Sequence, residues 1–190
     1  MELIEKLTAV ADAIRSKTGG TDEMTLDQMA AEIAGIQTGG GGTDLSAGLL
    51  MGTLTEYESE EVTNLRGYAF YQHTTLQRVI LPNLEGAAGT NPFRNCSALV
   101  FADLGICKII GATAFTDCTV LKTVILRQQS CASLLNVSAF ARTPFASGGT
   151  GGTVYVPSAL IETYKTATNW STLYAAGTCN FVAIEGSDYE

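Results

Sequence analysis

Phenylalanine residues recur along this chain at a nearly constant interval, and apolar residues follow each of them in the same order. The interval is 22 to 25 residues, and a small residue or proline precedes each ring: Phe70, Phe93, Phe115 and Phe140. Leucines come six and eleven residues after the first three rings: Leu76, Leu99 and Leu121, then Leu81, Leu104 and Leu126. A fixed period of this length is typical of solenoids, in which neighbouring units share one continuous core. The pattern therefore predicts about four stacked units and an extended surface rather than a catalytic pocket.

Short strand-like segments separated by turns lie along the chain, and the alternation of apolar and polar residues in 77–81 and 122–126 predicts strands with one buried face. The segments cover residues 48–57, 77–81, 99–104, 123–126 and 153–156. The glycine-rich run 148–152 predicts a flexible loop. In residues 158–190 we expect a cap in which Ser158 begins a helix that ends near residue 167, Trp170 covers the open end, and residues 181–184 form a last strand. For Trp170 a ligand platform is the alternative to a lid. The predicted fold class is α+β, with a short β-solenoid over residues 44–157.

Residues 1–37 predict a separate module of two short helices. The first helix has one apolar seam, formed by Leu3, Leu7, Val10 and Ile14. The second begins at a capping box and has a stripe that includes Leu26, Met29 and Ile33. Two helices this short have too small a core to fold alone, so we expect the seams to form an oligomer or to attach to a larger assembly. Docking on the solenoid is the alternative, but the glycine-rich linker 38–43 argues against it.

Composition and charge exclude several classes of partner. Charged residues make up only 16% of the chain, the net charge is −8, and Lys and Arg form no cluster, which argues against nucleic-acid binding. The first residues lack the pattern of a secretion signal, and no apolar run is long enough for membrane insertion. We therefore expect a protein that is made in the cytoplasm and stays there unless a particle carries it out.

Catalytic chemistry has little support in the sequence. The single histidine, His73, lies where other units have cysteine, so we expect a core or edge side chain and not a member of a triad. No phosphate-binding glycine loop is present, and the densest acidic group, Glu58, Glu60 and Glu61, predicts a solvated turn and not a metal site. The five cysteines predict buried free thiols. We expect no enzyme activity, no metal and no cofactor.

The positions one and two residues after each ring vary while the core positions repeat. In a stacked coil they form a column along one face, which contains Tyr71, Gln72, Arg94, Asn95, Thr116, Asp117, Ala141 and Arg142. Aromatic and planar polar side chains of this kind suit recognition of a sugar or of a protein surface. An ordinary solvated loop is the alternative.

The repeat resembles the BspA-like leucine-rich repeat, whose pattern is an "AF" followed by "C-x-x-L-x-x-V-x-L-P". The segments that carry the resemblance are residues 68–82 and 114–126, and the ending 154–170 is similar to the way many of these proteins terminate. The second unit departs from the pattern, with Pro92 before its ring and Phe101-Ala102-Asp103 in place of the valine strand. The resemblance implies a leucine-rich-repeat solenoid.

Residues 11–20 and 26–36 resemble a leader found on virion proteins of phages and prophages. This resemblance implies a protein of a phage tail or particle. We therefore expect an adhesion protein, held on the virion by other virion proteins and by copies of itself, which displays the solenoid to a bacterial surface glycan or protein. A structural or decorating virion component without a host ligand, and a bacterial cell-surface adhesin, are the alternatives.

Overall fold

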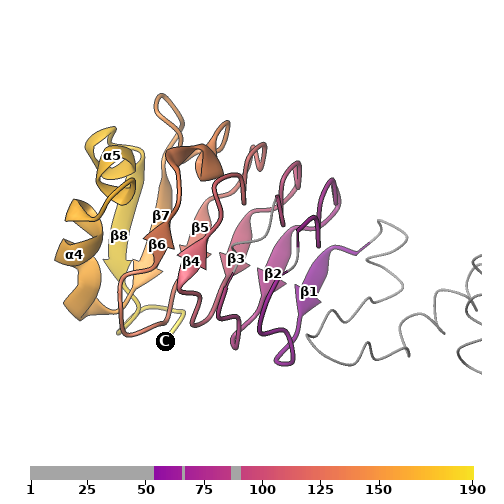
Figure 1. Cartoon of the computed structure of the whole chain (residues 1–190), viewed down its shortest axis with the longest axis horizontal. Helices are drawn as coiled ribbons and strands as arrows, with labels where there is room; N and C mark the ends of the chain where they lie inside the picture. Colours follow the sequence, from indigo (N-terminus) through magenta and orange to yellow (C-terminus); the bar gives the residue numbers. More distant parts are fainter. Residues whose placement is uncertain (1–53, 66, 87–90) are drawn as a thin grey trace, which may run out of the picture.

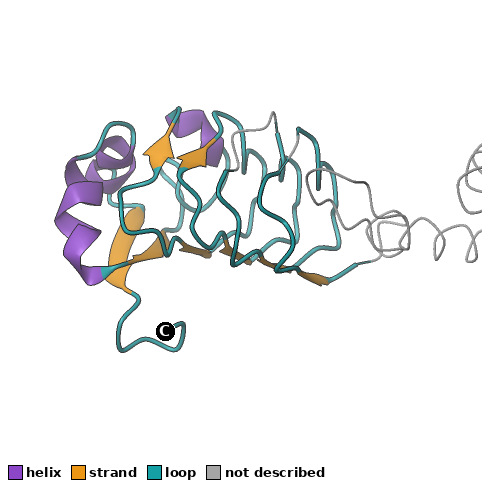
Figure 2. Cartoon of the chain, turned by 60° about the horizontal axis from the view of Figure 1, so that its bottom comes forward, coloured by secondary structure: helices purple, strands orange, loops and turns teal. Residues whose placement is uncertain are grey.

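The computed structural model describes residues 54–65, 67–86 and 91–190. Six strands form one parallel sheet along the coil (Figure 1): β1 (Glu56–Glu58), β2 (Arg78–Ile80), β3 (Phe101–Asp103), β5 (Thr123–Ile125), β7 (Gly152–Val156) and β8 (Cys179–Ala183). A second parallel pair, β4 (Ile109–Ile110) and β6 (Ser133–Leu134), lies on the opposite side of the coil (Figure 2). The sheet has two strands more than the four phenylalanine-marked units, because β1 precedes the first ring and β8 belongs to the cap. The predicted helical module 1–37 and the linker 38–43 lie outside the described residues.

The strands lie where the sequence predicts them; β2, β3 and β5 have shorter bounds than predicted, whereas β7 begins one residue earlier, at Gly152. The central residues of four neighbouring strands are in register and completely buried: Val79, Ala102, Val124 and Val154. Their neighbours in sequence point to the outer face of the sheet, because successive side chains of a strand alternate. Most of the predicted strand 48–57 lies outside the described residues, and the last strand begins two residues earlier than predicted, at Cys179.

The four phenylalanine rings stack in one column through the core. Their centroids lie 5.2, 5.0 and 5.4 Å apart along the chain, and the planes of neighbouring rings differ by 10°, 1° and 17°. These distances are close to the spacing of about 4.8 Å between hydrogen-bonded strands. One ring per turn therefore fits directly on the ring of the preceding turn. The six repeated leucines surround this column and are all fully buried.

A second column runs beside the rings, three residues after each of them. The Cys96 Sγ donates to the carbonyl of Phe70 at 2.9 Å, and the Cys118 Sγ donates to the carbonyl of Phe93 at 3.0 Å. Burial raises the pKa of the Cys118 thiol well above its usual range. All five cysteines are free, as predicted, and four of them are buried; the predicted burial is wrong for Cys131, which is half-buried.

The cap closes the far end of the ring column. The predicted helix consists of a 3-10 turn, η2 (Ser158–Leu160), and α4 (Ile161–Thr166); a further helix, α5 (Trp170–Ala175), was not predicted. Trp170 is completely buried, packs on Phe140 at 5.8 Å, and donates its Nε1–H to the carbonyl of Ala132 at 2.8 Å. It is therefore a lid and not a ligand platform.

The predicted N-cap at Ser158 is wrong. Its side chain caps no helix, and its backbone N–H donates to the Glu185 carboxylate at 2.9 Å. The backbone amide of Ser158 is therefore satisfied by Glu185, which lies 27 positions further along the chain.

We predict that Phe115→Ala lowers the free energy of unfolding by about 3–5 kcal/mol, because it opens a cavity between two stacked rings in a core with little room to collapse. Val120→Ala, on the exposed surface of the same turn, serves as the control and costs less than about 0.5 kcal/mol. Urea unfolding followed by circular dichroism measures both. Equal losses for the two variants would contradict a dependence of the fold on the ring column.

Candidate functional site

A column of left-handed backbone positions forms where the predicted surface column lies, two residues after each ring. The φ angles there are 61° at Gln72, 65° at Asn95, 67° at Asp117 and 58° at Arg142. Asn and Asp adopt this conformation more readily than other residues with a side chain. Neighbouring turns are joined by backbone hydrogen bonds, such as Asn95 N–H to the carbonyl of Thr116 at 2.9 Å and Asp117 N–H to the carbonyl of Ala141 at 3.0 Å. The predicted column therefore exists as a stack of hydrogen-bonded turns.

The C-terminal end of this column is an ion pair between successive turns. Both guanidinium nitrogens Nε and Nη2 of Arg142 donate to the carboxylate of Asp117. The hydrogen bond from Arg142, with its charge, lowers the pKa of Asp117. The Arg142 side chain stays 65% exposed, so the pair lies at the surface and adds little to stability.

One predicted contact residue is not at the surface. Thr116 is only 6% exposed, and its Oγ1 donates to the carbonyl of Ser138 at 2.7 Å. Its hydroxyl therefore joins two turns and is not free for a ligand. Tyr71, Arg94 and Asn95 are half-buried, whereas Gln72 and Arg142 are exposed.

An aromatic pair lies at the other end of the column. Tyr68, which is exposed, meets Tyr71 edge to face at 5.2 Å between ring centroids. The sequence pattern alone did not indicate Tyr68 as a site residue. Tyr68 could have been found from its repeat position, because it lies two residues before the ring of Phe70, as Asn91 lies two residues before the ring of Phe93. Both residues have a positive φ.

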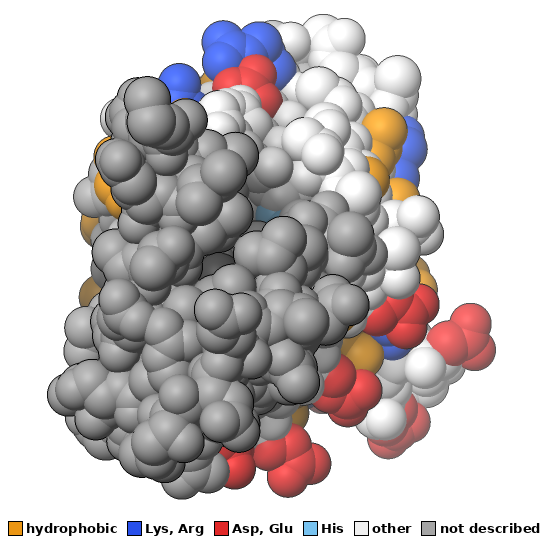
Figure 3. All heavy atoms as spheres, turned by 90° about the vertical axis from the view of Figure 1, so that its right-hand side faces the viewer, with side chains coloured by type: hydrophobic (Ala, Val, Ile, Leu, Met, Phe, Trp, Pro, Cys, Tyr) orange, Lys and Arg blue, Asp and Glu red, His pale blue; other side chains and the backbone are white. Residues whose placement is uncertain are grey.

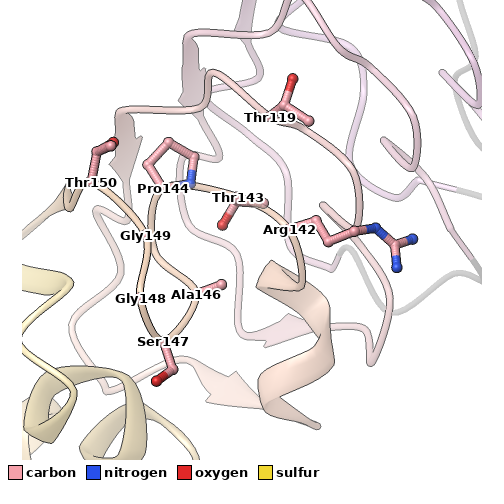
Figure 4. Close-up of a pocket in the computed structure, with 9 residues that line it drawn as sticks. All are labelled: Thr119, Arg142, Thr143, Pro144, Ala146, Ser147, Gly148, Gly149 and Thr150. Atoms are coloured by element: carbon pink, nitrogen blue, oxygen red, sulfur yellow. The ribbon is translucent and has the colours of Figure 1, made fainter.

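A polar hollow of about 310 Å³ lies beside Arg142 (Figure 4). Its lining residues come from two successive turns: Thr119, Arg142, Thr143, Pro144, Ala146, Ser147, Gly148, Gly149 and Thr150. The Arg142 guanidinium points away from the glycine loop, so the arginine stem forms one wall (Figure 4). The sequence pattern did not indicate Thr119, Ser147 and Thr150 either, because only the fold brings them together.

The glycine run beside the hollow is a structured turn, and the predicted flexible loop is wrong. Gly151 N–H donates to the carbonyl of Pro144 at 2.9 Å, and Gly149 N–H donates to the carbonyl of Ala146 at 2.8 Å. A Cβ at Gly149 would lie 2.4 Å from the Pro144 carbonyl oxygen, so the turn requires glycine there. Lys122 Nζ holds the next residue by donating to Thr150 Oγ1 at 2.7 Å.

A second, more apolar hollow of about 490 Å³ lies on the other side of Arg142, between the 3-10 turn η1 (Val137–Phe140) and α5. It shares Arg142, Ala146 and Ser147 with the polar hollow. Arg142 is therefore the residue at which the column and both hollows meet.

The other chemically distinctive residues form no site within the described parts of the chain. His73 is buried as predicted; its Nδ1 lies 3.5 Å from Thr75 Oγ1, and its Nε2 has no hydrogen-bond partner there. Glu58, Glu60 and Glu61 are exposed, and Figure 3 shows acidic side chains gathered along one side of the end where β1 lies. Among the residues described, no group of His, Cys, Asp and Glu could hold a metal ion. No helix in those ranges is long and apolar enough to cross a membrane.

Comparison with known proteins identifies the repeat. The family model for the BspA type leucine rich repeat region matches residues 53–150, in six copies. Neither the curated proteins nor the solved structures gave a significant match to the chain.

We predict that Arg142→Ala raises the pKa of Asp117 toward its ordinary value of about 3.9. Arg94→Ala is the matched control and raises the pKa of Asp117 less, because Arg94 acts on Asp117 through its charge and Arg142 acts through a hydrogen bond as well. Carboxyl ¹³C NMR titration measures both shifts. Because the folded-state pKa is lowered, the stabilisation by this pair is present above the unfolded-state pKa and is lost as pH falls through the folded-state pKa. An unchanged pKa in Arg142→Ala would show that the two side chains do not pair in solution.

Proposed function

The chain belongs to the BspA-type leucine-rich-repeat family, and we propose that this member is a phage virion-associated adhesion protein. Residues 1–37 attach it, with other copies, to a tail or another particle structure. Residues 38–43 serve as the tether. The repeat domain then presents its polar column and the hollows beside Arg142 to a ligand on the bacterial surface.

The observation that carries this proposal is the hydrogen-bonded column of left-handed turns that ends at two hollows. Backbone ladders hold each turn in place, so binding costs little ordering of the backbone. The Tyr68 ring, which is exposed, and the half-buried Tyr71 ring lie at one end, and the hydroxyl groups of Thr119, Ser147 and Thr150 lie at the other. Together they offer stacking and hydrogen bonding, which suit a surface glycan.

Weak individual sites fit the multivalent part of the proposal. A hollow of about 310 Å³ is at the lower end of the range of ligand pockets, so one site gives modest affinity. Linked copies convert later binding events into intramolecular ones and raise the avidity by roughly 10²–10⁴. The resemblance of residues 11–20 and 26–36 to phage leaders supports a particle as the platform that links the copies.

A structural or decorating virion component is the second candidate. Ile109 and Leu135 lie exposed on successive turns of the β4–β6 side, where Leu135 N–H bonds the carbonyl of Ile110 at 3.1 Å. Exposed apolar side chains on adjoining turns favour packing against another protein. A bacterial cell-surface adhesin would bind its ligand through the same repeat domain as the first candidate. It would differ only in being carried by a cell surface and not by a virion.

We predict that the fluorescently labelled full chain binds bacterial cells or their purified surface polysaccharide, and that Ser147→Trp and Arg142→Ala each weaken binding at least tenfold. The tryptophan fills the polar hollow, and the alanine removes the side chain shared by both hollows. Lys108→Ala is the matched control, since Lys108 is also exposed and paired, with Glu85, but lines neither hollow. Cell-binding assays and titration with the polysaccharide measure the effect.

Equal binding by all variants would contradict a site beside Arg142. Absence of binding to any cell type, together with association through Ile109 and Leu135, would favour the structural candidate.

We predict that the full chain is a defined oligomer and that Leu7→Glu with Ile14→Glu reduces it to a 20.0 kDa monomer, because charges would replace the apolar seam. Thr8→Glu, off the seam, leaves the oligomer intact. Static light scattering measures the masses, and circular dichroism checks the repeat domain. A monomeric full chain would remove the basis for multivalent binding by the isolated protein.

A further inference from the structure

A second apolar cluster lies outside the core, on the outer face of the sheet. Phe101 is 7% exposed and Ile125 is completely buried, although both occupy outward positions next to the inward Ala102 and Val124. Ile80 and Tyr155 pack against this cluster from the neighbouring strands β2 and β7. On an uncovered sheet these side chains would be in water, so something covers them.

The cover is the end of the described chain. Residues 185–190, here called the strap, follow β8 and turn back on the outer side of the sheet (Figure 2). The Tyr189 ring lies 5.5 Å from the ring of Phe101 and 4.7 Å from that of Tyr155, between centroids. Ile184, just before the strap, is buried in the same cluster.

The strap satisfies most of its own polar groups. Ser187 Oγ donates to the carbonyl of Ile184 at 2.6 Å and accepts from Tyr189 N–H at 3.2 Å. Gly186, at φ 76°, makes the turn, and its N–H donates to the Glu190 carboxylate at 3.1 Å. The loop is therefore closed on itself and presents the ring of Tyr189 to the sheet.

Few bonds join the strap to the rest of the protein. Glu185 accepts the Ser158 N–H, and hydrogen bonds from its own backbone N–H and from that of Ser158 lower its pKa. The last backbone bond from this segment to the sheet, among the residues described, is from Ile184 N–H to the carbonyl of Val156 at 3.0 Å. Residues 186–190 are thus held on the sheet by one aromatic side chain and not by a strand ladder.

The covered surface also has a cationic side chain. The Arg78 guanidinium lies 3.9 Å from the centroid of the Phe101 ring. Arg78 therefore adds positive charge beside the Phe101 ring, on which Tyr189 packs. In the sequence, Tyr189 lies between Asp188 and Glu190. The face also has an outward carboxylate, Asp103, but Arg127 Nη2 pairs with its Oδ2 at 2.8 Å. An aromatic ring between carboxylates therefore matches the apolar part of the face and the remaining charge, that of Arg78.

We propose that the outer face of β2, β3, β5 and β7 is a binding surface for a partner polypeptide segment in which an aromatic residue lies between acidic residues, and that the strap occupies this surface as an internal competitor. A partner segment reaches the surface when the strap leaves. The inference is independent of the proposed function, because it uses a different face of the coil and none of the residues beside Arg142.

The test uses the full chain, a chain lacking residues 186–190, and a synthetic peptide with the sequence of residues 183–190. We expect the peptide to shift the backbone amide NMR signals of β3 and β5 in the shortened chain saturably, with an affinity at least tenfold higher than for the intact chain. A peptide with alanine in place of its tyrosine, and the shortened chain with Phe101→Ala, are the matched controls and should both lose this binding.

Should the deletion impair folding, Tyr189→Ala in the intact chain is a second variant with an uncovered outer face. It removes only the ring that packs on Phe101 and Tyr155 and keeps the rest of the strap. It should also bind the peptide at least tenfold more tightly than the unaltered chain. The proposal is overturned if neither variant gives saturable shifts up to ~5 mM peptide, the range of effective concentration that a short tether provides. Equal binding by the intact and the opened chains would overturn the competitor role.

Discussion

The stacking of one phenylalanine ring per turn is the interaction on which the rest of this structure depends. The parallel backbone ladders set the distance between turns, and the ring spacing of 5.0 to 5.4 Å matches it closely. Intervals of 22, 23 and 25 residues keep this spacing, so the differences in length are taken up in the turns. At the far end Trp170 continues the column and shields Phe140 from water. The core is therefore a one-dimensional stack in which each turn depends chiefly on its neighbours.

The same constraint determines the candidate binding surface. After each ring has entered the core, the chain must reverse within three residues so that the next ladder position, such as Cys96 or Cys118, can also point inward. The left-handed residue two positions after the ring makes this reversal, and its side chain is left outside. Substitution at such a position alters the surface and leaves the ring column in place. A surface of this kind can vary in chemistry while its geometry stays constant, which suits a recognition module.

The repeated part of the fold was predictable from the sequence because its signals are local. Ring spacing, leucine spacing and alternation located the central strands. The burial of Cys96 and Cys118 followed from their places in the repeat, and that of Trp170 from the need to cap the open end of the stack. The errors arose where distant residues meet. Thr116 looked like a surface residue because its bond to the Ser138 carbonyl crosses 22 positions. Phe101 departs from the repeat as an outward apolar residue, and its cover, Tyr189, lies far along the chain.

The cap closes the end of the stack and also covers the outer face of the sheet, but these two tasks use separate contacts. Trp170, Tyr164 and Phe181 pack on one another, and Trp170 is anchored to the Ala132 carbonyl. The strap begins only after β8 has completed its ladder with β7, through register pairs from Gly152 with Cys179 to Val156 with Ala183. Loss of the strap from the sheet therefore exposes Phe101 and its neighbours without opening the end of the ring column. Exchange of the strap for another segment can then proceed on a folded scaffold, as regulated access to a binding surface requires.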